Sequence, residues 1–310
     1  MIPVLLGIIL IMFVLMELTG GDPALAILGE GATPEAIDQV HEQLGLDDPF
    51  IIRLGRYYKQ LILEQDFGTS YMSKKPVLEE IMARYPTTLK LALLSVLFGM
   101  VVGAAVGIIS AVRQYSILDK ICVSVSLFGV SAPSFWIAMM LVLLFSVKFG
   151  LLPASGNYGW QYWILPVCTM GGQVGAIIMR MARSSMLEVI RQDYIRTAKA
   201  KGQTALVTIM KHAFRNALIP IVTQVGLQLC ALMAGSVMIE TVFALPGLGK
   251  YIVDSVNMKD TPAAMGTILF IALNCIVINL IVDICYGFID PRIRAQYGGK
   301  PRRKKVAAIA

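Results

Sequence analysis

The chain alternates long apolar stretches with shorter polar segments. Six apolar stretches can cross or nearly cross a bilayer, which takes about 20 residues; they are 1–18, 89–112, 121–149, 161–182, 217–239 and 263–288. This pattern predicts an all-α membrane protein with six transmembrane helices, or five and a re-entrant piece. Segment 1–18 lacks a basic region before its apolar run and a small-residue cleavage site, so we expect a retained first transmembrane helix rather than a signal peptide.

Segment 19–88 follows a different pattern. It carries eleven acidic residues against six basic ones, and its apolar positions recur at helical spacing. Thr33 and Pro34 form a favourable helix start, and Gly45 after Leu44 is a favourable stop. A second short helix is expected from Pro49. The pattern predicts a small helical external cap region over 19–88, packed on a five-helix transmembrane domain over 89–289.

Composition agrees with a membrane protein. The chain is 56% hydrophobic and only 15% charged, with a mean hydropathy of +0.70, whereas soluble domains are about 25% charged. Its net charge of +7 comes from basic residues gathered in a few segments, so we expect no nucleic-acid partner. The five cysteines lie in or beside apolar spans without metal-ligand spacing, so no metal site is expected.

Charge asymmetry predicts the orientation. Residues 180–215 hold eight Lys/Arg against two acids, and the tail 290–310 holds seven against one. Basic excess beside membrane spans marks the cytoplasmic side. The basic loop and the basic tail are therefore expected in the cytoplasm with both termini, and the acidic segment 19–88 outside.

The basic loop 183–216 has an internal helical pattern. Residues Tyr194 to Lys201 favour a helix, and Gly202 favours a left-handed stop. After it, apolar residues recur every three or four positions, which gives a second helix with one apolar stripe. An ordered basic loop of this kind predicts a docking surface on the cytoplasmic face. The alternative is a set of basic anchors for anionic lipid.

The segment Asp193-Tyr194-Ile195-Arg196-Thr197-Ala198-Lys199-Ala200-Lys201-Gly202 resembles the EAA loop of ABC-importer permeases. In that family the loop is a coupling helix seated in a groove of the cytoplasmic ATPase. The family's Glu-Ala-Ala is replaced here by Arg196-Thr197-Ala198, so only the last alanine and the glycine match. The resemblance implies an ATPase-coupling loop made of Tyr194, Arg196, Thr197, Ala198, Lys199, Ala200, Lys201, Gly202 and His212.

Further stretches resemble the dipeptide, oligopeptide and nickel branch of these permeases. They are Gln43–Asp47, Asp66–Ser70, Gly235–Phe243 with Pro246–Lys250, the segment His212–Leu218, and Asp290–Arg294 after the last span. Pro246 and Gly247 predict a turn that ends a helix after Glu240. This segment is expected to form an external gate or binding-protein contact, the alternative being an ordinary interhelical turn; its residues are Glu240, Phe243, Pro246, Gly247 and Gly249.

Polar residues inside the spans are few. Gln224 and Gln228 share a helix face, and Asn274 lies in the last span. Such groups face a pathway or pair between helices, so both readings stay open. Pro133 and Pro166 are expected to kink or break their spans.

The chain has no GxxxxGK[ST] phosphate loop and no HExxH motif, so it is not expected to be an enzyme. The resemblance implies a type I ABC importer permease fold in the inner membrane of a prokaryote, for peptides or nickel. It implies a homologous second permease, two cytoplasmic ATPases that carry ATP and Mg²⁺, an extracytoplasmic solute-binding protein and membrane lipid as partners, with no cofactor in this chain. The alternatives are an ion-coupled transporter or channel acting without ATPases, and a membrane scaffold.

Overall fold

The computed structural model describes residues 2–18, 22–29, 31–64 and 66–289, and these are helical with no named strand. The basic tail and its Asp290–Arg294 motif lie outside the described residues. The helices are α1 (Ile2–Leu18), α2 (Pro23–Leu28), α3 (Pro34–Leu44), α4 (Phe50–Leu63), α5 (Val77–Val112), α6 (Ile117–Ser131), α7 (Ser134–Leu141), α8 (Ile164–Ile190), α9 (Asp193–Ala200), α10 (Ala205–Val207), α11 (Arg215–Gly235), α12 (Val237–Val242), α13 (Leu248–Asn257) and α14 (Thr261–Ile289).

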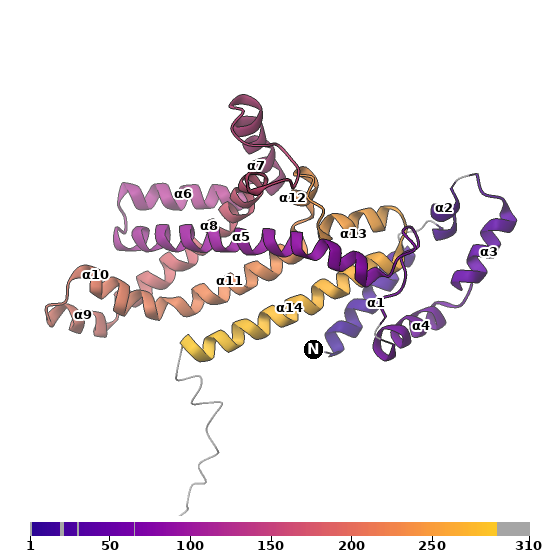
Figure 1. The fold of residues 1–310 in the computed structure, drawn as a ribbon. Coiled ribbons are helices and arrows are strands. Elements are labelled where there is room, and N and C mark those ends of the chain that lie inside the picture. The colour runs from indigo at the N-terminus through magenta and orange to yellow at the C-terminus, as the bar shows by residue number, and fades with distance from the viewer. Residues whose placement is uncertain (1, 19–21, 30, 65, 290–310) are drawn as a thin grey trace, which may run out of the picture.

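Shorter helical segments complete the chain. A π-helical segment, Val142–Lys148, extends α7, a 3₁₀ turn, Trp160–Trp163, leads into α8, and a second π-helical segment, Thr208–Phe214, joins α10 to α11. The cap helices α2–α4 lie at one end of the bundle, and α9 and α10 lie at the other (Figure 1).

Four continuous helices are long and apolar enough to cross a membrane among the described residues. They are Val77–Val112, Trp160–Ile190, Ala205–Ala234 and Thr261–Ile284. The predicted span 121–149 is instead a pair of helices, Ile117–Ser131 and Ser134–Lys148, bent by 106°. Counting that pair as one gives five spans, and the apolar helix α1 is shorter, so the count of six stays a prediction.

Proline accounts for the bend. Pro133 precedes the first residue of α7, and the cyclic side chain has no N–H with which to continue α6. This break was expected from the sequence. The expected kink at Pro166 was wrong, because this residue lies in the first turn of α8, where backbone N–H groups have no intrahelical acceptor.

Glycines hold α5 and α8 together at backbone contact. Gly99, Gly103 and Gly107 recur every four residues on α5 and face α8. A Cβ built on Gly103 would lie 2.4 Å from the carbonyl oxygen of Gly175, and one on Gly99 would lie 2.8 Å from that of Gly171. Small residues at this spacing let helices pack without an intervening layer of side chains. We refer to this contact as the glycine seam.

An ion pair between buried Asp119 and partly exposed Arg183 fixes the turn between α5 and α6 onto α8. Both carboxylate oxygens of Asp119 accept from Arg183, Nε at 2.8 Å and Nη2 at 2.9 Å. The Ser110 hydroxyl and the Tyr115 N–H also donate to this carboxylate. Because four donors reach the Asp119 carboxylate, this group can stay buried.

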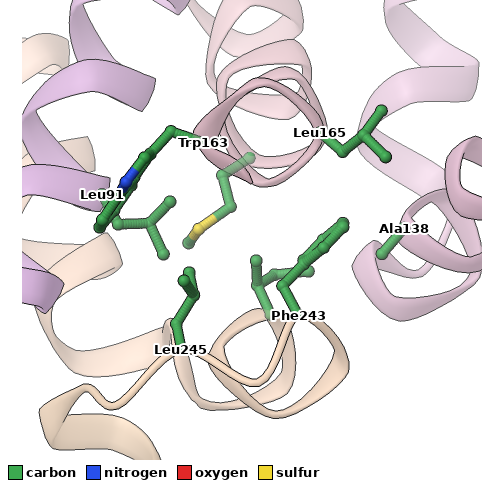
Figure 2. Packing of buried hydrophobic residues seen from close by; sticks show 8 residues of the cluster. Leu91, Ala138, Trp163, Leu165, Phe243 and Leu245 are labelled. Atoms are coloured by element: carbon green, nitrogen blue, oxygen red, sulfur yellow. The ribbon is translucent and has the colours of Figure 1, made fainter. Parts of the chain in front are cut away.

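An apolar core lies where α5, α7, α8 and α12 meet (Figure 2). Trp163, Phe243 and Leu245 pack with Leu91 and Ala138, and all five are buried. The ring of Trp163 also makes a cation–π contact, since Lys90 Nζ lies 4.1 Å from the ring centroid.

The cap is attached to the bundle through α1 and α14. Phe13 of α1, Leu54 of α4 and Met265 of α14 are buried in one cluster. The helix predicted between Thr33 and Gly45 is α3. The Thr33 hydroxyl accepts from the N–H of Ala36, and Gly45 ends α3 in the left-handed conformation, as the sequence indicated.

Candidate functional site

The loop between α8 and α11 is built around the predicted glycine. Helix α9 ends at Ala200, and Gly202 has φ +76°. The N–H of Gly202 donates to Lys199 O at 3.0 Å, and the N–H of Gln203 donates to Ala198 O at 3.3 Å. These two bonds form a Schellman motif, which turns the chain sharply after a helix. The predicted left-handed stop at Gly202 is confirmed.

Helix α9 has two distinct faces. Ile195 and Ala198 are buried three residues apart, and Ile195 packs in a cluster with Ala111 of α5 and Met186 of α8. The other predicted coupling residues of α9 and its cap are exposed: Tyr194, Arg196, Thr197, Lys199, Ala200, Lys201 and Gly202. The helix is therefore held to the bundle by its apolar face, with its basic face turned outward. Of the predicted coupling residues within α9, only Ala198 belongs to the inward face.

The second helix of the loop continues directly into the membrane span. Residues Ala205–Ala234 form one continuous helix. His212 links this helix to the cap of α9, because its Nε2 lies 2.9 Å from Gln203 Oε1. The expected apolar stripe is only partly inward: Ala213 is fully buried, whereas Leu206 is 72% exposed.

At the opposite end of the bundle, Glu240 organises the predicted gate segment. Its side chain is fully buried. Oε1 accepts from the hydroxyls of Thr88 and Ser236, both at 2.7 Å, and Oε2 accepts from the N–H of Lys250 at 2.9 Å. The Thr88 oxygen in turn accepts from the N–H of Leu248 at 2.8 Å. The carboxyl group thus lies at the N-terminus of α13, where the helix dipole favours it. We call this network the Glu240 clamp.

Steric crowding explains why this segment has glycine at two positions. A Cβ on Gly247 would lie 2.3 Å from the Glu240 carboxyl carbon, and a Cβ on Gly249 would lie 2.9 Å from Val237. Phe243 is buried in the core of Figure 2, while Pro246 is exposed. The helix expected to end at Glu240 ends earlier, at Gly235, and Glu240 sits inside the short α12. The turn covers Phe243–Gly247, and Gly249 already belongs to α13.

The three predicted pathway residues do not gather in one place. Asn274 Oδ1 accepts from the Tyr85 hydroxyl at 2.7 Å and joins α14 to α5, which is the interhelical pairing that the sequence left open. Gln224 and Gln228 are half-buried on α11. A cavity of about 540 Å³ lies elsewhere, between α5, α6, α7 and α8; it includes Trp136, Gln173 and none of the three.

Two contacts were missed by the sequence reasoning. Thr88 and Glu240 are 152 residues apart in sequence, and Asp119 and Arg183 are 64 apart. The residues next to a threonine or a charged residue at the edge of an apolar span do not indicate which distant residue it contacts. Such pairings are seen only when the helices are placed together.

The chain matches known transport proteins over nearly its whole length. The family described as "Binding-protein-dependent transport system inner membrane component" matches residues 103–295, and the N-terminal region of the same kind of component matches residues 1–92. The chain belongs to this family. The permease is 42% identical over 294 residues to the glutathione transport system permease protein GsiC of Salmonella paratyphi A, covering 95% of this chain and 96% of the relative. GsiC of Escherichia coli K12 is 40% identical, again covering 95% of this chain and 96% of the relative.

Solved structures support the fold. The permease aligns with a chain of the MetNI methionine ABC transporter in an inward-facing conformation, with a TM-score of 0.59 at 19% identity over 69% of this chain and 97% of the other. A chain of an amino acid ABC transporter aligns with a TM-score of 0.54 at 13% identity over 67% and 92%. The protein is a permease subunit of an ABC importer with the type I fold, a multi-pass membrane protein of the bacterial inner membrane. ATP hydrolysis belongs to partner ATPases in this family.

Proposed function

We propose that α9 and its Gly202 cap are the surface through which partner ATPases drive this permease. The observation that carries the proposal is the two-faced helix. Ile195 packs against α5 and α8, Ala198 is buried on the same face, and the basic residues project outward. Tyr194 and Leu206 are exposed beside those charges. Aromatic and apolar groups among basic ones are typical of a protein interface.

The proposed cycle is alternating access. Closure of the two ATPases moves the docked α9, and the pathway between this chain and a homologous second permease changes from inward- to outward-facing. The solute-binding protein then delivers its solute on the external side. ATP has to bind one of the two states of the transporter more tightly than the other, because a ligand that binds both states equally does not shift the equilibrium between them.

The substrate we propose is a short peptide, with glutathione as the first compound to test. Two relatives that are 40–42% identical over 95% of this chain are named as glutathione permeases. Glutathione is itself a tripeptide, so it falls in the peptide class that the sequence resemblance implied. Uptake of labelled glutathione into cells that express the complete system tests this directly, with an uptake-deficient host as the control.

The docking proposal is tested by charge reversal. Arg196→Glu with Lys199→Glu should remove the ATPases from the complex purified in mild detergent, because both side chains lie on the outward face. The matched control is Lys59→Glu on the exposed face of α4, which should leave the complex intact. ATPases that co-purify with the double variant as with the wild type would refute the α9 interface.

The orientation is tested by labelling. A cysteine at Glu35 of α3 should react with an impermeant thiol reagent added to intact cells, and a cysteine at Gln203 should react only after the cells are opened. Both positions are exposed in the structure, so burial does not explain a difference. The reverse pattern would place α9 outside the cell and remove it from any ATPase.

A further inference from the structure

A polar cavity of about 480 Å³ lies between the cap and the top of α14. Its walls come from α4, from the end of α3, from the loop at residues 68–74 and from Met265 near the start of α14. It is separate from the α9 surface and from the Glu240 clamp. Its volume falls within the range of about 300–1,000 Å³ that small-molecule sites occupy.

Three cationic side chains line this cavity: Arg53, Arg56 and Lys74. Arg53 pairs with Glu17 through Nη1, and Arg56 pairs with Asp48 through Nη2. A guanidinium group has five N–H donors, so each arginine keeps donors beyond its ion pair. Lys74 forms no ion pair among the described residues. The cavity wall therefore offers several cationic donors to one anionic group.

A hydroxyl in the same wall has no partner. The Tyr57 oxygen is buried and makes no hydrogen bond in the part of the chain that the structure describes. Buried polar groups nearly always have a partner, so an orphaned one calls for an explanation. Burial raises the pKa of Tyr57 above its ordinary value, so the hydroxyl keeps its proton and can donate to an acceptor in the cavity.

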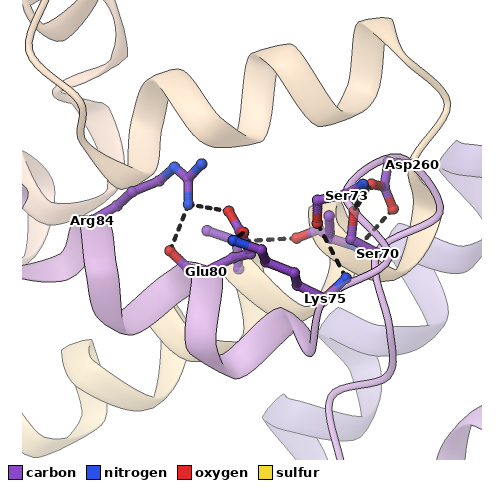
Figure 3. A network of polar contacts seen from close by, with 8 residues as sticks. Ser70, Ser73, Lys75, Glu80, Arg84 and Asp260 are labelled. Atoms are coloured by element: carbon purple, nitrogen blue, oxygen red, sulfur yellow. Dashed lines mark hydrogen bonds and ion pairs between the residues drawn. The ribbon is translucent and has the colours of Figure 1, made fainter.

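The loop that forms one side of the cavity is held rigidly (Figure 3). The Asp260 carboxylate accepts from the Ser70 hydroxyl, from Tyr71 N–H at 3.0 Å and from Met72 N–H at 3.3 Å. Asp260 is buried directly before α14. The cavity wall is thus anchored to a transmembrane helix, and its shape is present before any ligand binds.

Building on the peptide substrate proposed above, we infer that this cap cavity binds the carboxylate end of a small peptide or peptide-like solute. Arginine N–H groups and the Tyr57 hydroxyl match a planar, two-oxygen acceptor. Phe13, Met265 and the Tyr57 ring supply apolar surface for the rest of the solute. An inorganic anion is far smaller than 480 Å³ and would leave that surface bare.

The test is calorimetric titration of the purified full-length permease in detergent with glutathione. Wild-type protein should bind it, and the diethyl ester of glutathione, which has no free carboxylate, should bind at least about tenfold more weakly because charge-assisted bonds are lost. Tyr57→Phe removes one oxygen and should weaken binding about fivefold or more. No binding by the wild type, or equal binding of acid and ester, would overturn the inference.

Paired variants separate ligand contact from cap stability. Arg56→Gln should weaken glutathione binding about tenfold. Asp48→Asn breaks the same ion pair but leaves Arg56 in place, so it should bind as tightly as the wild type or more tightly. Equal losses in both variants would mean that the ion pair only supports the cap, and would refute the site. Lys59→Gln, exposed on α4 outside the cavity, is the control with no expected change. Because the readout is binding, failure here leaves the α9 docking test unaffected.

Discussion

The two ends of this permease treat their polar residues in opposite ways. At the α9 end, the charged side chains are exposed and the apolar ones are fixed to the bundle. At the other end, the carboxyl group of Glu240 is fully buried, and three donors from three segments converge on it. The first surface leaves its hydrogen-bonding capacity available to another protein. The second uses that capacity within the chain to hold α12 and α13 to α5, and its role at an external gate stays a prediction.

The largest effect is expected at the Glu240 clamp. Glu240→Leu leaves the Thr88 hydroxyl, the Ser236 hydroxyl and the Lys250 N–H without an acceptor. Each orphaned buried donor costs about 1–3 kcal/mol, so the variant should lose about 3 kcal/mol or more of stability. Thermal unfolding of the purified permease measures this, with Glu42→Leu on the exposed face of α3 as control. A variant as stable as that control would show that the clamp contributes little.

The contrasting prediction concerns Gly202. A Cβ there meets no atom within 4 Å, but the φ of +76° remains unfavourable for a side chain. Gly202→Val should therefore cost only about 1–2 kcal/mol and leave abundance near normal, while α9 is misplaced and ATPase association and transport fall. Abundance in the membrane, ATPase co-purification and transport are measured on the same sample. Normal transport with normal ATPase association would favour the reading of the loop as a lipid anchor.

The smallest effect is a pH dependence confined to the cap. The hydrogen bond from His41 to Asp22, at 2.8 Å, and the charges of Asp22 and Asp47 raise the pKa of His41 above 6.5. Since the folded pKa is raised, this stabilisation is complete below pH 6.5 and is lost as pH rises through the folded pKa. The protection of α2 and α3 against hydrogen exchange, measured relative to the intrinsic exchange rate at each pH, should fall over that window. His41→Gln should abolish this loss of protection. An equal loss of protection in α9 would mean a global effect.

The sequence predicted features that depend on neighbouring residues. The Thr33 cap, the left-handed Gly45 and Gly202, and the break at Pro133 all follow from local backbone chemistry, and the structure has each of them. The resemblance to the EAA loop located the α9 surface for the same reason, because its residues are contiguous.

Features that depend on packing were not predicted. The glycine seam needs the relative rotation of α5 and α8, and the Glu240 clamp needs Thr88 to face α12, neither of which a single helix pattern contains. The expected kink at Pro166 failed because the start of α8 could not be placed to within one turn. The burial of Glu240 was not predicted either, because a sequence pattern does not show which polar groups have partners.

Helix α5 takes part in both ends. Ala111 packs in the cluster that seats α9, and Thr88 belongs to the Glu240 clamp. They are 23 positions apart, or about 34 Å at 1.5 Å per residue. Along much of that length the glycine seam leaves no compressible layer between α5 and α8. We therefore expect the two helices to move together as one rigid body, so that a displacement imposed at the α9 end also shifts the Glu240 clamp.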